Sequence, residues 1–173
     1  KGIVGAIDHE FEQEKKILII DADPQASLMD TLFEDMEAEK EVAGLAQYLL
    51  GRVSHTDIVY ELRPNISFVS SGGYDWFNAW DKSKEASQEL FKSKVKELLS
   101  NYDFDFVVFD TGPGYLRLIS EAIVSLSDEL VLPFTDGKDG ELSLRKTIHF
   151  LSKLNTSSQK VKLVPSRMNL QHI

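Results

Sequence analysis

The stretch Lys16-Ile17-Leu18-Ile19-Ile20-Asp21-Ala22-Asp23-Pro24-Gln25 decides how this chain folds. A run of aliphatic residues without polar alternation is typical of a strand that is buried on both faces of a parallel sheet. Pro24 lacks a backbone N–H and disfavours helical geometry at the residue before it, so the strand must end there. Ligands of open α/β sheets bind at the carboxyl ends of the strands. The sequence therefore predicts that Asp21 and Asp23 lie at a ligand-binding edge, with helix-capping loop aspartates as the alternative.

A second apolar strand ends in the same way. Phe106-Val107-Val108-Phe109 runs directly into Asp110-Thr111-Gly112-Pro113-Gly114. An acid in this position, followed by a hydroxyl residue and a Gly/Pro turn, suits the Mg²⁺ ligand of a nucleotide-hydrolysing site, because Mg²⁺ keeps several waters and takes few direct carboxylates. We therefore expect Asp21 and Asp110 to lie at one sheet edge and to hold a hydrated Mg²⁺.

A phospho-acceptor receiver domain fits the same acidic residues, since its first and third strands also end in aspartates. The spacing argues against it. A βαβ unit needs only about 30 residues or somewhat more, whereas the chain between Asp21 and Asp110 has room for two or three further elements. The receiver hypothesis predicts acid-labile phosphorylation of Asp110 and stays open as a less favoured alternative.

The motif Asp-Ala-Asp-Pro-Gln-Ala-Ser at 21–27, followed far downstream by Phe-Asp-Thr-Gly-Pro at 109–113, resembles the ParA/Soj/MinD family of deviant Walker-type P-loop ATPases. The Asp-Pro-Gln ending is more similar to the ParA branch, and the resemblance covers essentially the whole chain. It implies a doubly wound, mainly parallel α/β sheet flanked by helices that uses ATP or ADP with Mg²⁺. It also implies that Asp23 orients the attacking water. Gly112 stands where the family motif has a proline, so the path of that loop stays open.

The family's phosphate loop is the part that does not match. Lys1-Gly2 corresponds to the start of its Lys-Gly-Gly-x-Gly-Lys-Thr motif, but no Gly-Lys-Ser/Thr occurs in the sequence. Either a loop and a helical turn are missing from the sequence after Gly2, or the protein has lost ATP binding and acts as a scaffold. The apolar residues that follow Gly2 are spaced like one face of a helix, which favours the first explanation. We therefore expect a single P-loop NTPase-like domain over 1–173, incomplete at both ends and after Gly2.

Three further site assignments come from the resemblance alone. Lys1 matches the family's signature lysine, which reaches the phosphates of the partner subunit in a nucleotide-sandwich homodimer; a solvated terminus is the alternative. Gly2 belongs to the nucleotide-binding loop. Asn169 follows the last predicted strand, where relatives carry an Asn or Asp that helps to read adenine, although an ordinary turn residue fits equally well.

Composition limits the possible partners. The chain of 173 residues has a formal net charge of −9 and no cysteine, which excludes disulfides and cysteine-ligated clusters. It has no apolar run long enough to span a membrane, so we expect a cytoplasmic protein. Negative charge disfavours phosphate backbones. Non-specific DNA binding at the nucleoid and a ParB-like centromere-binding partner therefore follow from the resemblance only. The resemblance also implies a slow, partner-stimulated ATPase. Such a protein would position plasmid or chromosome DNA, or similar cargo, by ATP-dependent dimerisation.

Strands and helices are predicted to alternate along the rest of the chain, as in a fold built from right-handed crossovers. The aromatic cluster at 74–80 is expected to pack into the core, with a partner-binding patch as the alternative. The Ser70-Ser71-Gly72-Gly73 segment reads as a turn, because no lysine follows its glycines. The predicted strands are 66–69, 106–109, 129–133 and 160–165, and the predicted helices are 26–33, 42–50, one around 91–99, 115–126 and one around 144–154.

Overall fold

A computed structural model describes most of the chain. The described residues are 15–23, 28, 42–73, 84–112, 117–154 and 156–166. The chain divides into two compact units, Lys1–Ala122 and Ile123–Ile173. The predictions for Lys1, Gly2, Asn169, the aromatic cluster and nearly all of the helix at 26–33 lie outside the described residues.

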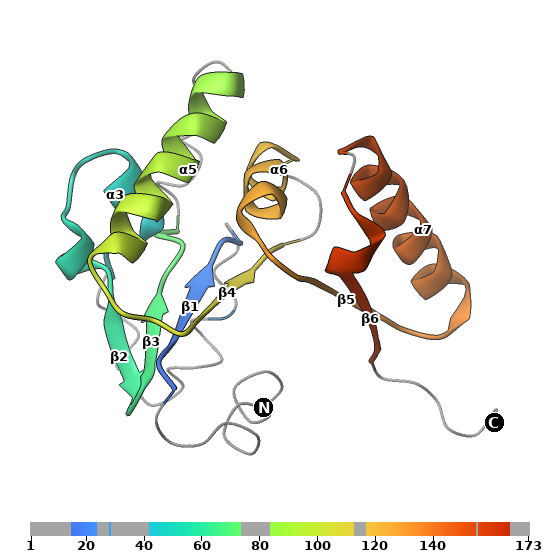
Figure 1. Cartoon of the computed structure of the whole chain (residues 1–173), viewed down its shortest axis with the longest axis horizontal. Helices are drawn as coiled ribbons and strands as arrows, with labels where there is room; N and C mark the ends of the chain where they lie inside the picture. Colours follow the sequence, from blue (N-terminus) through green and yellow to red (C-terminus); the bar gives the residue numbers. More distant parts are fainter. Residues whose placement is uncertain are drawn as a thin grey trace. The chain divides into compact units, whose positions relative to one another are not determined.

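The first unit contains a sheet with the strand order β2-β3-β1-β4 (Figure 1). Strands β1 (Ile17–Asp21), β3 (Ile66–Val69) and β4 (Phe106–Asp110) run parallel, with β1 between the other two. Every residue of β1 is buried, as its unbroken aliphatic sequence predicts. The predicted strands at the two acidic motifs therefore exist and are neighbours.

Strand β2 (Tyr60–Arg63) was not predicted and makes the sheet mixed rather than wholly parallel. It pairs antiparallel with β3 through a tight connection in which Asn65 adopts a φ of 64°. Its residues alternate between half-buried and exposed, the pattern of an antiparallel edge strand with one solvated face. Such a short alternating segment gives a weaker sequence signal than the long aliphatic runs of the parallel strands.

The core of this unit forms on both faces of β1. Ile17 and Ile19 cluster with Ile66 and Phe68 on one face, while Leu18, on the other, is completely buried. Successive side chains of a strand point to opposite faces, so a strand covered on both sides must be apolar at every position. This requirement explains the unbroken aliphatic run.

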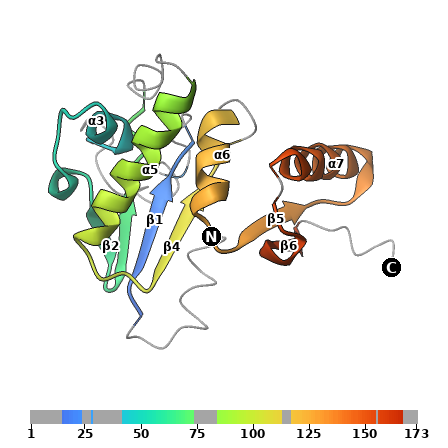
Figure 2. The same ribbon diagram turned by 45° about the horizontal axis from the view of Figure 1, so that its top comes forward.

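Helices α3 (Leu45–Leu49) and α5 (Lys84–Ser100) pack against each other beside this sheet (Figure 2). Gly51 ends α3 as predicted: its φ is +70°, and its N–H donates to the carbonyl of Tyr48. A 3₁₀ turn, η1 (His55–Asp57), follows.

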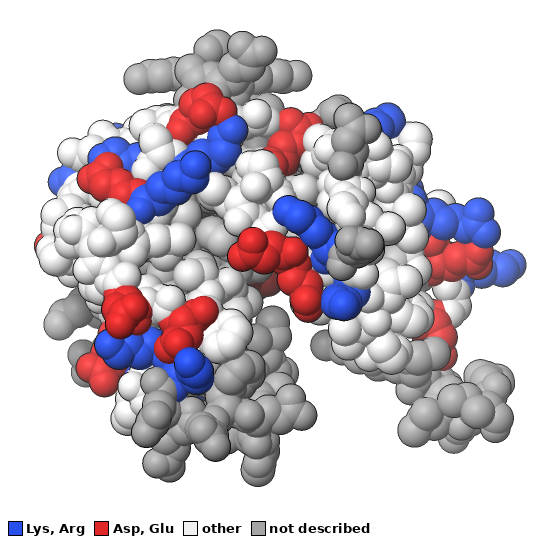
Figure 3. All heavy atoms as spheres, viewed as in Figure 1, with Lys and Arg blue, Asp and Glu red and all other residues white. Residues whose placement is uncertain are grey.

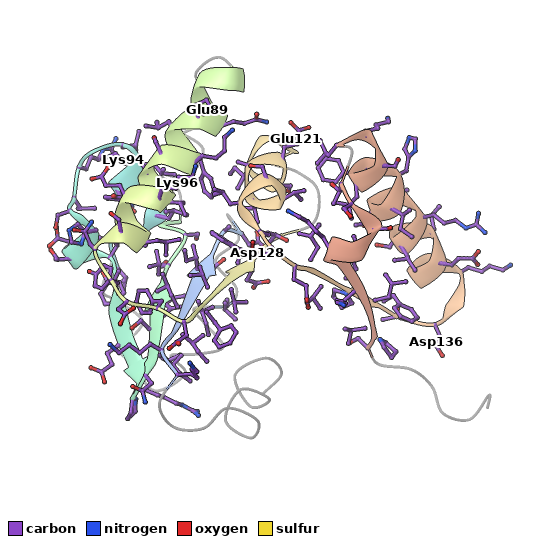
Figure 4. All side chains as sticks on the ribbon, in the orientation of Figure 1. Glu89, Lys94, Lys96, Glu121, Asp128 and Asp136 are labelled. Atoms are coloured by element: carbon purple, nitrogen blue, oxygen red, sulfur yellow. The ribbon has the colours of Figure 1, made fainter. Side chains whose placement is uncertain are left out.

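Helix α5 confirms the predicted apolar face. Phe91, Val95 and Leu98 are at most 1% exposed. Its outer face is charged, and Figure 4 labels Glu89 and Lys96 there. The contrast between the two faces is that of an amphipathic helix packed on a core.

Helix α6 (Arg117–Leu126) spans the boundary between the units. In the first unit, its Glu121 accepts a hydrogen bond of 2.7 Å from the side-chain amide of Gln88 on α5. The predicted helix at 115–126 is thus present in its described part.

The second unit contains β5 (Leu130–Phe134), α7 (Gly137–Lys153), the 3₁₀ turn η2 (Ser158–Lys160) and β6 (Val161–Pro165). Strands β5 and β6 pair in parallel, and the six described strands form two sheets instead of one. Within α7, Leu151 is buried but Ile148 is 47% exposed, so the predicted apolar face is only partly covered. No helix in the described part of the chain has both the length and the apolar character to cross a membrane.

Candidate functional site

The two acidic strand ends meet at one edge of the first unit's sheet. Strands β1 and β4 are paired in a register that sets Asp21 directly beside Asp110. The backbone N–H of Ala22 donates a hydrogen bond of 2.8 Å to the carbonyl of Asp110, which extends the pairing one step past the strand ends. Neighbouring strands lie about 4.8 Å apart. The predicted proximity of Asp21 and Asp110 is therefore observed.

The Asp21 carboxyl group is completely buried. One oxygen, Oδ1, accepts a hydrogen bond of 2.9 Å from the backbone N–H of Asp23. The other, Oδ2, is buried with no hydrogen-bond partner among the described residues. A buried oxygen without a partner costs about 1–3 kcal/mol, and more when it is charged. A cation bound at Oδ2 would remove this cost.

Protonation is the other way to relieve the buried charge. Burial raises the pKa of Asp21 to about 7; the hydrogen bond from Asp23 opposes this shift, and the negative charges of Asp110 and Asp23 add to it. Burial, with the charge of Asp23, also raises the pKa of Asp110, against a hydrogen bond from the backbone of Thr111. Like charges crowded together disfavour ionisation in this way. The carboxyl groups of Asp21 and Asp110 therefore keep their protons to a higher pH than free aspartates do.

Asp23 reaches from the loop after β1 to the loop after β4. A methyl group placed on Gly112 would lie 2.5 Å from both Cγ and Oδ1 of Asp23, and 2.6 Å from Oδ2. The Asp23 carboxylate thus lies directly against the bare Cα of Gly112. One feature of the sequence points to this contact: a glycine stands at 112, where the family motif has a proline.

The donor set fits a hydrated Mg²⁺ better than a metal enclosed by protein ligands. No group of three or more His, Cys, Asp or Glu side chains in the described ranges could hold a metal ion by itself. Mg²⁺ is usually bound through one or two carboxylates plus substrate phosphates, and it keeps several waters. Asp21 and Asp110 could supply that part of the coordination. Lys1, Gly2 and Asn169, predicted to contact the nucleotide, lie outside the described residues.

The turn after β3 lies beside the acidic edge, since β3 is paired with β1. It is a turn, as predicted, with positive φ at Gly72 and Gly73. The sequence did not predict that this turn is held by Gln47. The Gln47 side chain accepts a hydrogen bond from the N–H of Gly44 (2.9 Å) and donates one to the carbonyl of Gly72 (3.1 Å). A side chain that bridges two loops distant in sequence leaves no local pattern to find.

Comparison with known sequences gives a family match over nearly the whole chain. A family model described as an AAA domain matches residues 9–164. Among curated proteins, the maintenance of carboxysome distribution protein A of Gloeothece citriformis is 31% identical over 146 residues, covering 83% of this chain and 55% of that protein. The chain thus spans about half the length of this relative.

Solved structures share the fold. A putative plasmid partition protein from Borrelia burgdorferi bound to AMPPNP superposes with a TM-score of 0.75 at 24% identity, covering 91% of this chain and 66% of that one. A variant of Cyanothece McdA in complex with ATP gives a TM-score of 0.66 at 25% identity, covering 88% and 59%. The predicted α/β class, a sheet flanked by helices, is confirmed.

Proposed function

Because this chain belongs to the AAA-domain family that it matches, within the ParA/Soj/MinD group of deviant Walker-type P-loop ATPases, we propose that it is an ATP-dependent molecular switch. Its Mg²⁺·nucleotide site would lie at the carboxyl edge of β1 and β4. The observation that carries the proposal is the buried Asp21 carboxyl beside Asp110, with an oxygen that has no partner in the described structure. A hydrated metal next to a triphosphate would satisfy it.

Each acidic residue has a separate role in this site. Asp21 and Asp110 would hold a hydrated Mg²⁺, which would supply positive charge to offset the charge of the nucleotide phosphates. Asp21 would have to be ionised to take part in holding the metal, because only a carboxylate acts as a ligand. Asp23, at the mouth of the same edge, accepts a hydrogen bond from the attacking water and orients it. The site thereby combines charge neutralisation with positioning.

The remaining nucleotide contacts are proposed from family membership. Gly2 belongs to the phosphate-binding loop, Lys1 reaches the phosphates bound by the second subunit of a homodimer, and Asn169 contacts adenine. Hydrolysis would be slow and stimulated by a partner, because the output of such a switch is a change of assembly state rather than released product.

The cargo is proposed from the names of relatives. One relative is named for the maintenance of carboxysome distribution, and a solved structure with the same fold is that of a putative plasmid partition protein. We therefore propose that this protein positions a large cytoplasmic cargo, such as a plasmid, a chromosome or a protein compartment, with a ParB-like or analogous adaptor. Lys and Arg are interspersed with Asp and Glu on the face shown in Figure 3, and the net charge is −9. Non-specific DNA binding thus rests on the family alone.

Calorimetric titration of the full-length protein with Mg²⁺·ATP tests the proposal directly. We expect binding, and we expect Asp23→Ala to keep that affinity while losing measurable turnover. Asp128→Ala, which removes an exposed aspartate of the second unit (Figure 4), is the matched control and should behave like wild type. Absence of ATP binding would leave the scaffold alternative, and normal turnover in Asp23→Ala would remove Asp23 from its role.

A further inference from the structure

The contact between Asp23 and Gly112 joins two loops that are far apart in the sequence. All three side-chain atoms nearest to a methyl group at 112 belong to the Asp23 carboxylate, at 2.5–2.6 Å. Real Cβ atoms essentially never approach other heavy atoms this closely, so the carboxylate occupies the volume that any side chain at 112 would need. The lack of a side chain at Gly112 is what allows Asp23 to adopt this position.

Hydrogen bonds hold the backbone of both loops close to this contact. The Asp23 backbone is held by its 2.9 Å hydrogen bond to Oδ1 of the buried Asp21. The loop after β4 is held at its start, where the N–H of Ala22 donates to the carbonyl of Asp110 at 2.8 Å. The first hydrogen bond is made by Asp23 itself, and the second lies two residues before Gly112. The atoms that a methyl group at 112 would strike are the far end of the Asp23 side chain, which moves more easily than the backbone, so the methyl group would displace the Asp23 carboxylate.

We propose that Gly112 is a positioning residue that fixes the orientation of the Asp23 carboxylate at the acidic edge. The inference rests on the proposed function, because it assigns to Gly112 the task of aiming the group that orients water. It concerns the conformation of the side chain and not the binding of the nucleotide. Gly112 should consequently affect the rate of the chemical step and leave ATP affinity alone.

Kinetics of Gly112→Ala test this separation. A misplacement of about 1 Å can cost on the order of a hundredfold in rate, so we expect kcat to fall by about tenfold to a hundredfold, while KM and the calorimetric affinity for Mg²⁺·ATP stay within about twofold of wild type. The rate is divided by the concentration of ATP-binding sites, which removes any effect of misfolded protein. A fall in affinity with unchanged kcat would overturn the proposal.

Gly73→Ala is the matched glycine control. A methyl group at Gly73 meets no described atom within 4 Å, although the φ of +56° at this position makes any side chain there strained. We expect this variant to lose some stability but to keep the wild-type kcat. An equal loss of kcat in both glycine variants would show that the effect is not specific to the Asp23 contact, and would overturn the proposal.

A double-mutant comparison of stability tests the contact without any nucleotide. Gly112→Ala should lower the urea midpoint in the wild-type background, and should lower it by less than half as much in the Asp23→Ala background, where the atoms it would strike are gone. If Gly112→Ala fails to fold, the double variant should restore folding. Equal shifts in both backgrounds, or no restoration, would overturn the inference. Coupling without ATP binding would instead refute the proposed function and leave the contact established.

Discussion

At the scale of single residues, the acidic edge contains a carboxyl group that folding alone does not favour. Asp21 is fully buried, yet one of its oxygens has no partner in the described structure, and its neighbours Asp23 and Asp110 are also acidic. An asparagine would keep the shape and remove the charge. Perturbed carboxylates of this kind cluster at functional sites. The cost in stability of burying the Asp21 carboxyl is consistent with a role in binding a cation.

The raised pKa of Asp21 predicts how metal-free stability depends on pH. The unfolded chain releases this proton near its ordinary pKa of 3.8, whereas the folded protein keeps it up to about pH 7. Between these values the unfolded state binds fewer protons, so the unfolding free energy decreases as pH rises. One pKa unit corresponds to about 1.4 kcal/mol. We therefore expect Asp21→Asn, in EDTA at pH 8, to be more stable than wild type by a few kcal/mol.

Urea unfolding of both proteins from pH 4 to pH 8 measures this difference. The two curves should agree near pH 4 and separate as pH rises. Asp105→Asn is a control of opposite sign, because the hydrogen bond and charge of Lys15 (2.8 Å) lower the pKa of Asp105. The Asp105 carboxylate stabilises the folded protein at neutral pH and loses this effect in acid. Asp105→Asn should therefore destabilise the protein most at neutral pH. If the effect of Asp21→Asn on stability did not change with pH, the raised pKa of Asp21 would be contradicted.

At the scale of secondary-structure elements, the packing of α5 is the clearest link between sequence and stability. Leu98 is completely buried, whereas Lys96, two positions earlier on the same helix, is exposed (Figure 4). Truncation of a buried leucine removes apolar contacts and leaves a cavity, at a cost of about 2–5 kcal/mol. We expect Leu98→Ala to destabilise by this amount and Lys96→Ala by less than about 0.5 kcal/mol. Equal effects in chemical denaturation would show that the helix does not pack on this face.

Elements with a strong periodic or continuous pattern were predictable, and those defined by long-range partners were not. The aliphatic runs gave β1 and β4, and the apolar face that includes Phe91 gave α5. Strand β2 was not predicted, because an edge strand has only a short alternation of half-buried and exposed residues in its sequence. The bridge by Gln47 and the contact of Gly112 with Asp23 depend on loops that meet only in the folded chain. Sequence thus located the acidic edge but not the contacts that shape it.

At the scale of the whole molecule, the described part of the proposed site belongs to one unit. Asp21, Asp23, Asp110 and Gly112 all lie in Lys1–Ala122. The acidic edge can therefore be tested by variants within this unit. The proposed function adds a second level, in which two copies of the protein would close around nucleotide and Lys1 would contact the phosphates bound by the other copy. Whether two copies associate is tested by measuring the molecular mass of the protein in solution.

Nucleotide-dependent assembly gives the prediction with the widest consequence. With Mg²⁺·ATP, the full-length Asp23→Ala protein should be dimeric in light scattering after gel filtration, because ATP binds but is not consumed; with ADP it should be monomeric. Adding Lys1→Ala should abolish the dimer and preserve ATP binding, since in the proposed dimer this lysine compensates the negative charge of the nucleotide bound by the other subunit. Lys15→Ala, whose side chain is paired with Asp105 at the opposite end of β1, should leave the dimer intact. A dimer that persists without Lys1 would mean that the subunits associate through another surface, and that ATP controls something other than this contact.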